Sequence, residues 1–532
     1  MPEYLITRSE PSGRHHGKKH IIIVGAGIIG VCTAYYIVKH PKFDPEKFHI
    51  TIFESKRVAG GASGKAGGLL ALWAFPQQIV TLSFDLHQQL SNEYNGTEEW
   101  GYRRLTTVSL EGDISHLDSD EEEETNGIAS FGKVKLTQQE QEIKDSFKKS
   151  VTHDSDSSSS LSDKPPKKSS RTTRSSSVAG ASSSIKNRLP QDLNWITSSL
   201  IDNCTTLGGT DTTAQVHPYK FTNFMLKKAV EFSGGAIELI IGKVNEITYS
   251  METGSATGVT YQPTSIKEEE KNRKPITVLG DQIVLSVGPW TSKILPDCPI
   301  SGLRAHSITV SPFKDQPVSP YAIFTEFKTG PYSYISPEIY ARQDEVYVCG
   351  EGDSAVDVPE TTDDVEVVKS KCDELFKQVG KISPNLSKGH ILKRQACYLP
   401  VLDVPSSSGP LIGETNVANL YLASGHSCWG INNAPGTGKI LSELLLDGDV
   451  RSADISALDP SLYFDASVLV EDDDDDDDLD DLDDEFDDDD DDEYDDDDHV
   501  QYGHSNSNAN SKSNHPEEDS SETGPSDAEW SR

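Results

Sequence analysis

Three glycines and an acidic residue are spaced as in a nucleotide-binding turn. Gly25, Gly27 and Gly30 follow the apolar run 21–24, and Glu54 ends a second apolar run that begins at residue 50. Gly25 allows a tight turn, Gly27 lets the backbone approach a pyrophosphate, and Gly30 lets a helix pack closely on the strand. The first turn of such a helix offers N–H groups and a positive dipole end to phosphates. Because the Glu54 carboxylate can accept hydrogen bonds from ribose hydroxyls, the pattern predicts a site for the ADP part of FAD or NAD.

A second glycine-rich segment favours FAD over NAD. Residues 61–70 read Gly-Ala-Ser-Gly-Lys-Ala-Gly-Gly-Leu-Leu and begin seven residues after Glu54. An FAD fold needs a loop here because the riboflavin half must pass the first strand, whereas an NAD fold does not. A flexible glycine linker is the alternative, but hydrophobic sequence on both sides argues against it. A Walker A loop is excluded, because Gly64-Lys65 lacks the full spacer and a following Ser or Thr.

The motifs together resemble one known family. Besides the two glycine segments, the chain carries Ser-Val-Gly-Pro-Trp at 286–290, Gly-Pro-Leu-Ile-Gly at 409–413 and Gly-His-Ser-Cys-Trp-Gly at 425–430. This set resembles the FAD-dependent D-amino-acid oxidase family, which includes glycine oxidase and sarcosine oxidase. The low-complexity segments and Gln-Ala-Cys-Tyr at 395–398 resemble a fungal subgroup of oxidoreductases linked to cargo retrieval from late endosomes to the Golgi. The resemblance implies FAD as cofactor and a small-molecule amine or amino-acid-like substrate.

The resemblance also implies which residues contact the cofactor. The first glycine turn would hold the pyrophosphate, Glu54 and Ser55 the ribose, and Val244 the adenine through its backbone. The second loop would line the path to the isoalloxazine, and the late glycine turn would pack on the flavin. The full expected set is Gly25, Ala26, Gly27, Ile28, Ile29, Gly30, Glu54, Ser55, Ala62, Ser63, Lys65, Ala66, Gly67, Gly68, Val244, Gly288, Gly425, His426, Gly430 and Ile431.

Three residues are candidates for catalysis, each with a structural alternative. Lys65 could assist oxygen reactivity as a cation near the flavin, or pair with phosphate. Tyr398 could line the substrate pocket or belong to the core. His426 could transfer a proton or make only a structural hydrogen bond. One position departs from the family: Leu399 stands before Pro400, where amino-acid oxidases place a carboxylate-binding arginine, whose planar fork suits that task.

Alternating apolar runs and helical patterns predict an α/β protein around these motifs. We expect strands at 21–24, 50–54, 236–241, 283–287, 346–350 and 420–424, and helices from 216 to about 232 and from 438 to 446. The resemblance gives the architecture: a Rossmann-like FAD-binding domain of glutathione-reductase type, an antiparallel-sheet substrate domain, and disordered acidic inserts.

Composition separates globular from low-complexity sequence. The 532-residue chain has a net charge of −39, of which 24 negative charges lie between residues 471 and 498, so the globular part is only mildly acidic. A basic surface for nucleic acid is therefore not expected. Seven scattered cysteines indicate reduced thiols and no metal site. The nearly uncharged stretch 21–38 could be taken for a membrane helix, but its three glycines and basic flanks argue against a membrane span.

We expect the chain to divide as follows: a disordered N-terminus (1–17), FAD-binding segments (18–112, 191–300 and 393–465), a disordered Ser-rich and acidic insert (113–190), a substrate domain (301–392) and a disordered acidic tail (466–532). Leu479, Leu482 and Phe486 in the tail could form an apolar stripe on a trafficking partner, or the tail could only solubilise the protein.

Two functions remain open. The first is an oxidoreductase that transfers a hydride from a CH–NH donor to flavin and that we expect in the cytoplasm, in association with late endosomes. The second is a flavin-binding scaffold in endosomal trafficking. An NAD-linked dehydrogenase is a third possibility, and it predicts no bound flavin.

Overall fold

The computed structural model describes residues 7–118, 189–264, 274–313, 318–405, 407 and 409–467. All of them belong to one compact unit, residues 1–474. The predicted disordered segments 113–190 and 466–532 lie outside the described residues except at 113–118, 189–190 and 466–467. The predicted interaction stripe of the tail also lies outside them.

A nine-stranded sheet carries the first glycine turn. Four buried strands, β3, β2, β12 and β20, run parallel at its centre, and β9 extends the parallel set beyond β3. Antiparallel pairs flank this centre on both sides. The order is β11 (Ile276–Leu279), β10 (Ser255–Pro263), β9 (Ile237–Ser250), β3 (Phe48–Glu54), β2 (Lys19–Val24), β12 (Gln282–Leu285), β20 (Leu420–Ser424) and β19 (Leu411–Glu414), with β1 (Thr7–Arg8) beside β9. Parallel strands bring their carboxyl ends to one edge, where ligands of open α/β sheets bind.

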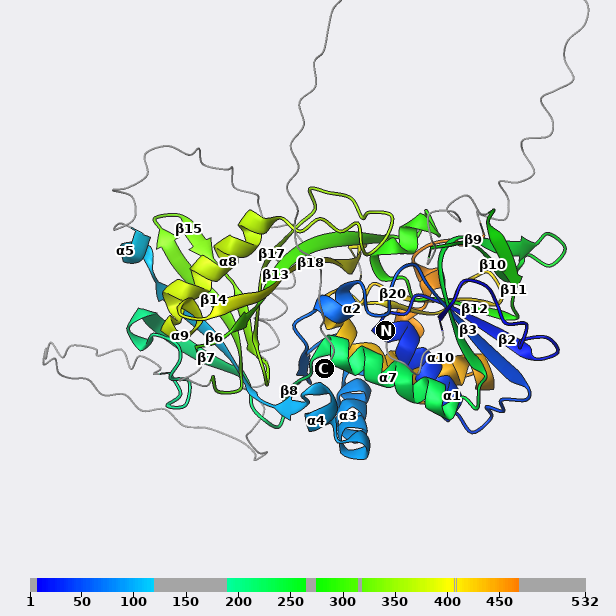
Figure 1. The fold of residues 1–532 in the computed structure, drawn as a ribbon, viewed down its shortest axis with the longest axis horizontal. Helices are drawn as coiled ribbons and strands as arrows, with labels where there is room; N and C mark the ends of the chain where they lie inside the picture. The colour runs from blue at the N-terminus through cyan, green and yellow to red at the C-terminus, as the bar shows by residue number, and fades with distance from the viewer. Residues whose placement is uncertain are drawn as a thin grey trace, which may run out of the picture. The chain divides into compact units, whose positions relative to one another are not determined.

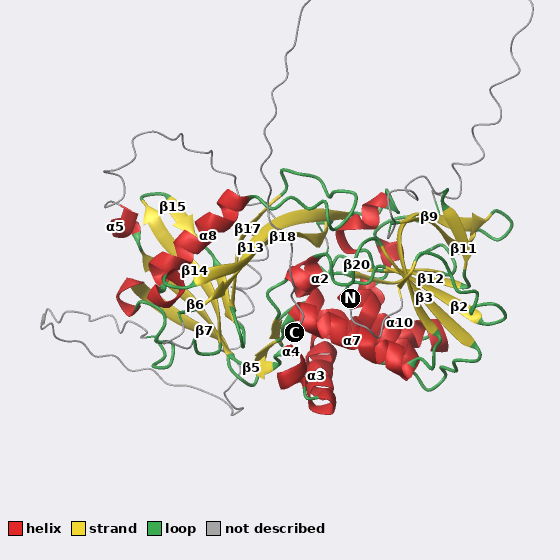
Figure 2. Ribbon diagram, viewed as in Figure 1, coloured by secondary structure: helices red, strands yellow, loops and turns green. Residues whose placement is uncertain are grey.

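Three helices pack together against this sheet, as Figure 2 shows. They are α1 (Ile28–Lys39), α7 (Pro218–Phe232) and α10 (Gly430–Asp447). Ten of the twelve residues of α1 are buried, which explains its almost uninterrupted apolar sequence. A Cβ on Gly438 would lie 2.5 Å from the Cys32 carbonyl carbon, so this glycine allows α10 to approach the backbone of α1.

A second sheet has eight strands, and most of its labels lie on the left of Figure 1. Its pairs are antiparallel except β14 and β6, which run parallel. The order is β18 (His390–Leu402), β13 (Ile300–Ser311), β17 (Val346–Asp353), β16 (Glu338–Ala341), β14 (Tyr321–Gly330), β6 (Thr106–Asp113) and β7 (Ile201–Gly208), with β15 (Ser333–Ile335) beside β14. Helix α8 (Lys369–Ile382) buries Cys372, Leu375, Val379 and Ile382 in the core of this sheet.

The remaining elements are short or connect the two sheets. A three-stranded sheet consists of β4 (Leu69–Ala71), β8 (Thr213–Gln215) and β5 (Arg103–Arg104). The other helices are α2 (Ala62–Lys65), α3 (Gln77–Tyr94), α4 (Gly96–Trp100), α5 (Ser115–Asp118) and α9 (Pro384–Ser387). The 3₁₀ helices in the described residues are η1 (Ser198–Leu200), η3 (Gly288–Lys293), η4 (Ser427–Trp429), η5 (Ser456–Leu458) and η6 (Pro460–Leu462).

Residues 7–17 are ordered, contrary to the prediction of a disordered N-terminus. Strand β1 pairs in parallel with β9, and the Ser12 N–H donates to Glu238 at 3.0 Å. The His15 ring stacks on His20 with centroids 4.6 Å apart. The sequence gave no signal for this segment, because its strand pairing and the Ser12 hydrogen bond are to residues more than 200 positions away and it has no apolar periodicity of its own.

Helix α10 begins at Gly430, eight residues before the predicted start. Its Pro435 has no N–H to donate to the Ile431 carbonyl. The His87 imidazole, with its Nε2 2.9 Å from that carbonyl oxygen, replaces the missing donor. The Asn432 Oδ1 accepts from the Ala71 N–H at 2.9 Å. Asparagine, glycine and proline residues that indicated a turn therefore lie inside a helix, because tertiary hydrogen bonds satisfy its first turns.

The predicted fold class is confirmed: the chain is an α/β protein with a Rossmann-like sheet and a largely antiparallel sheet. The antiparallel sheet includes β6, β7 and β18, which lie wholly or mainly outside the range 301–392 expected for it. The residue boundaries of the domains stay a prediction. Among the helices of the described residues, none is long and apolar enough to cross a membrane.

Candidate functional site

One cavity of about 1100 Å³ extends from the carboxyl edge of the nine-stranded sheet to a face of the eight-stranded sheet. Small-molecule pockets typically have volumes of about 300–1,000 Å³, so this cavity is large enough for an extended cofactor and a small substrate. We call the part beside the nine-stranded sheet the cofactor half, and the part lined by the eight-stranded sheet the substrate half.

The first glycine turn has the geometry that the sequence predicts. Gly25 has a φ of +102°, and a Cβ there would lie 2.5 Å from the Ser286 carbonyl oxygen. A Cβ on Gly30 would lie 2.2 Å from the Gly25 carbonyl oxygen. The Ser286 hydroxyl donates to the Val24 carbonyl at 2.9 Å, which joins the ends of β12 and β2. Gly25 thus allows the turn and Gly30 the close approach of α1, and α1 points its N-terminus at the cavity.

The Glu54 carboxylate lies at the end of β3 and lines the cavity. It accepts from the Ala26 N–H at 3.1 Å, from the Lys56 N–H at 3.0 Å and from the Ser55 hydroxyl at 3.2 Å. Burial raises the pKa of the Glu54 carboxyl, and the N–H donors oppose this shift. The hydrogen bonds fix the carboxylate at the mouth of the turn, where a ribose would lie if the ADP part sits on α1.

The second glycine loop continues the cofactor half. Gly68 has a φ of +91°, and a Cβ there would lie 2.1 Å from the Val216 carbonyl oxygen. A Cβ on Gly67 would lie 2.2 Å from Tyr340, so this loop lies directly against the eight-stranded sheet. The Ser63 hydroxyl accepts from the Ile28 N–H at 2.9 Å, which fastens α2 to the start of α1.

A buried arginine that the sequence analysis missed fastens this loop to the eight-stranded sheet. The Arg342 guanidinium donates to the Gly67 carbonyl at 3.1 and 3.2 Å and also to the Ala66 carbonyl. It pairs with Glu345 at 2.6 Å and lies over the Tyr347 ring. Burial raises the pKa of Glu345, but the Arg342 charge opposes this and the net shift is downward. Only tertiary structure reveals the role, because Arg342 is 275 residues from Gly67.

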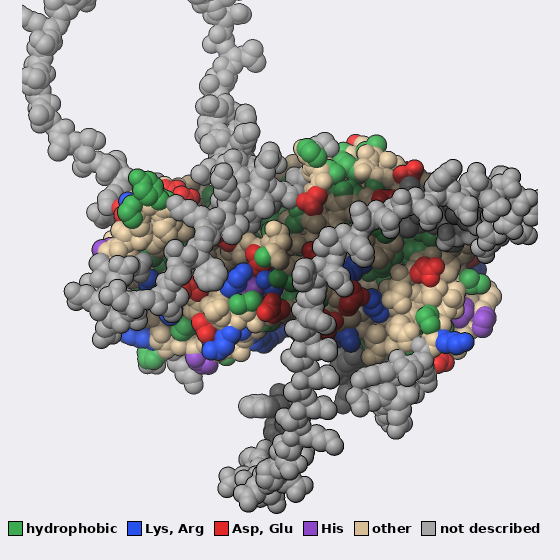
Figure 3. Space-filling view, turned by 90° about the horizontal axis from the view of Figure 1, so that it is seen from above, with side chains coloured by type: hydrophobic (Ala, Val, Ile, Leu, Met, Phe, Trp, Pro, Cys, Tyr) green, Lys and Arg blue, Asp and Glu red, His purple; other side chains and the backbone are tan. Residues whose placement is uncertain are grey.

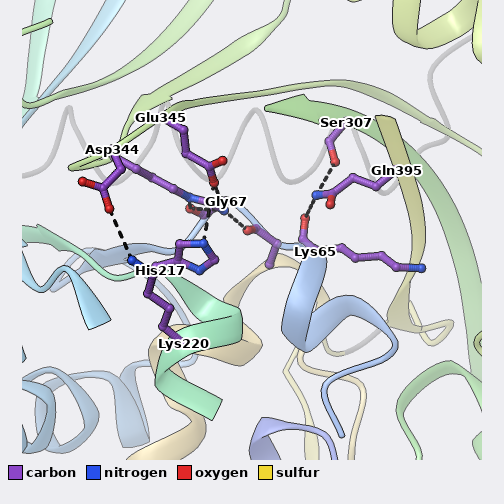
Figure 4. A network of polar contacts seen from close by, with 10 residues as sticks. Lys65, Gly67, His217, Lys220, Ser307, Asp344, Glu345 and Gln395 are labelled. Atoms are coloured by element: carbon purple, nitrogen blue, oxygen red, sulfur yellow. Dashed lines mark hydrogen bonds and ion pairs between the residues drawn. The ribbon is translucent and has the colours of Figure 1, made fainter. Parts of the chain in front are cut away.

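Figure 4 shows how this network extends to α7. His217 lies with its Nε2 3.7 Å from the Glu345 carboxylate, and Lys220 pairs with Asp344 at 3.3 Å. Burial and the Arg342 charge lower the pKa of His217 to about 4, so this histidine is neutral at neutral pH. On the other side of the loop, Gln395 donates to the Lys65 carbonyl at 2.9 Å and to Ser307 at 3.1 Å. The network joins α2, α7 and the eight-stranded sheet around the second loop.

The candidates for catalysis differ in their positions. His426 lines the cavity; its Nε2 lies 3.1 Å from the Thr437 hydroxyl, and burial lowers its pKa to about 3, so it is neutral at neutral pH. Lys65 does not line the cavity: its ammonium donates to the Ala396 carbonyl at 2.9 Å, and burial lowers its pKa. Tyr398 is also outside the lining, since its hydroxyl donates to the carbonyls of Val356 and Asp357. The geometry brings only His426 of the three to the cavity.

Most of the residues predicted to bind the cofactor come together on the cavity. Those that line it are Gly25, Gly27, Ile28, Ile29, Glu54, Ser55, Ala62, Ser63, Ala66, Gly67, Gly68, Val244, Gly288, His426, Gly430 and Ile431. Ala26, Gly30, Lys65 and Gly425 do not line it. Ala26 and Gly30 act behind the lining, because one donates to Glu54 and the other allows close packing of α1.

Two observations fit these residues to a bound dinucleotide. A Cβ on Gly61, which lines the cavity, would make only ordinary contacts with Thr362 and Trp290, so the loop leaves space beside its backbone. The Thr362 hydroxyl lines the same half, is buried and makes no hydrogen bond within the described chain. A buried hydroxyl normally has a partner, and a polar group of a ligand can supply it. Sequence alone gave no signal for Thr362.

The substrate half is lined by residues from one face of the eight-stranded sheet, most of them alternating along their strands. Tyr340 and Tyr347 stack with centroids 5.8 Å apart, and Phe324 meets Tyr340 edge to face at 6.1 Å. Leu399 and Cys397 also face the cavity, so the position where the family resemblance leads one to expect an arginine carries an aliphatic side chain there. Burial raises the pKa of the Cys397 thiol to about 11, which leaves it protonated at neutral pH.

Comparisons with known proteins agree on the family and fold. The family model "FAD dependent oxidoreductase" matches residues 20–156 and 182–444. "Putative oxidoreductase TDA3" of Saccharomyces cerevisiae is 51% identical over 513 residues, which cover 86% of this chain and 97% of the yeast protein. "Putative oxidoreductase C1F5.03c" of Schizosaccharomyces pombe is 33% identical and covers 83% of this chain and 98% of its own.

Solved structures show the same fold at low sequence identity. Glycine oxidase from Geobacillus kaustophilus superposes with a TM-score of 0.54 at 14% identity, over 83% of this chain and 98% of its own. L-amino acid deaminase from Proteus myxofaciens gives a TM-score of 0.54 at 14% identity, over 86% of this chain and 96% of its own.

Proposed function

The chain belongs to the family of FAD dependent oxidoreductases, and from that premise we propose that it oxidises a small molecule at a CH–NH group, with FAD bound in the large cavity. The observation that carries the proposal is the continuity of this cavity. Its cofactor half is bounded by the two glycine loops and its substrate half by aromatic side chains of the other sheet. A donor bound there would lie beside the inner end of a cofactor whose ADP part sits on α1.

The residues of the chain would hold and align the reactants. The N-terminus of α1 and Glu54 would bind the pyrophosphate and ribose, and the loop at 61–68 would bind the middle of the cofactor. Bound FAD would accept the hydride, and the reduced cofactor would then pass the electrons to oxygen or another acceptor. The stacked rings of Tyr340 and Tyr347 would exclude water and orient the donor C–H bond. His426 is neutral and can act as a hydrogen-bond donor or acceptor, but it supplies no positive charge.

The proposed reaction balances without a metal. The C–H bond beside nitrogen breaks, its hydride leaves with both electrons, and the C–N bond becomes C=N while a proton passes from nitrogen to solvent. Water then hydrolyses the imine to a carbonyl compound and an amine. The glycine oxidase and L-amino acid deaminase named above act on amino acids by their names, and they support the reaction class rather than the substrate.

The alternative is a flavin-binding scaffold in endosomal trafficking. The role in late endosome-to-Golgi retrieval and the cytoplasmic location in association with late endosomes stay predictions. A trafficking partner for the acidic tail also stays a prediction, since the tail lies outside the described residues. Acidic and basic side chains are interspersed on the described part of the face in Figure 3, which does not suggest binding to nucleic acid there.

Anaerobic reduction of the purified holoprotein tests the proposal. The protein should be yellow and release FAD on heat denaturation. A panel of primary amines, N-methyl amino acids and D-amino acids is then mixed with it without oxygen, and the loss of oxidised-flavin absorbance is followed. At least one donor should bleach the flavin, and the same donor deuterated at the reacting carbon should bleach it more slowly. A yellow protein that no donor bleaches would favour the scaffold, and a colourless protein would contradict both functions.

A further inference from the structure

The substrate half of the cavity is lined by carboxylates. Glu111 on β6 and Glu326 on β14 are register partners on adjacent strands, and Glu338 on β16 is the register partner of Cys349. All three acidic residues line the cavity. Glu111 and Glu326 are exposed, whereas Glu338 is only partly exposed. The acidic groups therefore extend from the open end of the substrate half inward along one sheet face.

The basic residues in the described lining lie elsewhere. They are Lys243 and Lys293. Lys243 is on β9, two residues after the last residue that pairs with β3, and Lys293 ends η3. Both pair with Glu360, Lys293 at 2.7 Å. No arginine or lysine of the described chain lines the substrate half. The charged side chains in the described lining of this half are acidic, and repulsion between like charges would disfavour a ligand carboxylate there.

Glu338 lies close to the cofactor half. Its carboxylate accepts a hydrogen bond from the Tyr340 hydroxyl, and the Cys349 thiol donates to it at 3.6 Å. The ring of Tyr340 lies against Gly67, because a Cβ on this glycine would be only 2.2 Å from it. Burial raises the pKa of the thiols of Cys349 and Cys428, and the negative charge of Glu338 raises both further. The charge of Glu338 therefore affects the thiols of Cys349 and Cys428, which both line the cavity.

Aromatic rings complete the surroundings of this carboxylate. Phe324, Tyr340, Tyr347 and Trp429 all line the cavity. Aromatic faces attract ammonium groups through their quadrupoles. Carboxylate and aromatic faces in one enclosed space are complementary to an organic cation, and they are poorly suited to an anion or a zwitterion held by its carboxylate.

We propose that the substrate half binds a cationic amine that has no carboxylate, and that Glu338 is the residue that determines this specificity. The proposal rests on the proposed function, because it names the substrate class of the same site. The ammonium group binds between Glu338 and the aromatic faces, with the carbon beside nitrogen directed toward the second glycine loop.

Binding of matched ligands to the FAD-loaded protein tests this proposal. Tert-butylammonium and trimethylacetate share a tert-butyl group and carry opposite charges. Neither has a hydrogen on the carbon that bears the charged group, so tert-butylammonium cannot be oxidised there. Each is titrated anaerobically while the flavin absorbance spectrum is followed. We expect saturable binding of the cation with a Kd at least tenfold below that of the carboxylate. Equal or tighter binding of the carboxylate, or no saturable change with the cation, would overturn the proposal.

Variants locate the effect. Glu338→Gln should weaken binding of tert-butylammonium about tenfold, whereas Glu351→Gln, at an exposed position on neighbouring β17 outside the lining, should leave it unchanged. An unchanged Kd in Glu338→Gln would overturn the role of Glu338. If Glu338→Gln does not fold, the comparison of the two ligands on the unmodified protein still decides the charge preference.

The outcome is distinguishable from failure of the proposed function. If zwitterionic donors bleach the flavin while the cation does not bind, the substrate class is wrong and the oxidoreductase stands. If the cation binds selectively but no donor in the anaerobic panel bleaches the flavin, the charge preference stands and the oxidoreductase function fails.

Discussion

At the scale of single residues, the nucleotide turn depends on positions where a side chain does not fit. A Cβ on Gly30 would lie 2.2 Å from the Gly25 carbonyl oxygen, which is backbone and cannot rotate away. We expect Gly30→Ala to lower the free energy of unfolding by about 1–3 kcal/mol through overpacking and to reduce the FAD content of the purified protein. Chemical denaturation and the absorbance of heat-released flavin measure the two effects.

Gly330→Ala is the matched control, because a Cβ there would make one ordinary contact of 3.7 Å with Ser333. It should change neither quantity by a measurable amount. A Gly30→Ala protein with full FAD content and unchanged stability would contradict the role of this glycine in the turn.

Arg342 carries a second prediction at this scale. Its guanidinium is buried and satisfies Glu345 and two carbonyls of the second glycine loop. Arg342→Met leaves the Glu345 charge without its main partner, so we expect a loss of about 3–5 kcal/mol in stability. Arg342→Lys should recover only part of this loss, because an ammonium cannot reproduce the fork of a guanidinium. Denaturant unfolding curves give both values.

Arg57→Met is the control, because it removes an exposed arginine–carboxylate ion pair. Arg57 lies 3.0 Å from Asp363. Both side chains are largely exposed, so the change should cost less than about 1 kcal/mol. If Arg342→Met cost no more than Arg57→Met, the loop would not depend on the buried arginine.

At the scale of elements, the start of α10 depends on a histidine from α3. Burial lowers the pKa of His87 to about 4, although its hydrogen bonds to Ile431 and Asn432 oppose the shift. The folded state therefore binds fewer protons at His87 than the unfolded state does between pH 6.5 and 4. Its contribution to stability is full above about pH 6.5 and is lost as the pH falls toward 4.

We expect the free energy of unfolding to fall across this pH window, and His87→Gln to make the fall shallower. Denaturant unfolding at several pH values between 7.5 and 4 measures both slopes. His390→Gln, at an exposed position at the start of β18, should keep the slope of the unmodified protein. A His87→Gln protein with an unchanged slope would show that His87 is not titrating as the structure indicates.

Sequence predicts elements well where the pattern is local. The buried strands at the glycine turn and helix α7 were predicted near their observed bounds, because apolar runs and punctuating glycines mark them. The start of α10 was predicted eight residues late, because Pro435 and two asparagines indicate a turn unless their partners on α3 and β4 are known. Local signals cannot contain those partners.

At the scale of the whole described unit, the site forms only when two sheets meet. The face of the substrate half comes from β6, β7, β13, β14, β16, β17 and β18, which are separated by up to about 300 residues in the chain. The residues of the cofactor half could be predicted, because they belong to short motifs that are recognisable in the sequence. Those of the substrate half could not, because register between distant strands decides that Glu111, Glu326 and Glu338 share one face. For the same reason the sequence could not decide between a pocket position and a core position for Tyr398, which lies outside the lining, and it gave no signal for Glu338 or Arg342.

The central claim is that this chain binds FAD and uses it to oxidise an amine. Anaerobic mixing of the yellow holoprotein with a cationic primary amine, followed by the loss of oxidised-flavin absorbance, tests the claim most directly. We expect complete bleaching, which should be slower for the amine deuterated at the reacting carbon. Persistence of the oxidised spectrum with every amine and amino acid of the panel, in protein that holds a full equivalent of FAD, would contradict it.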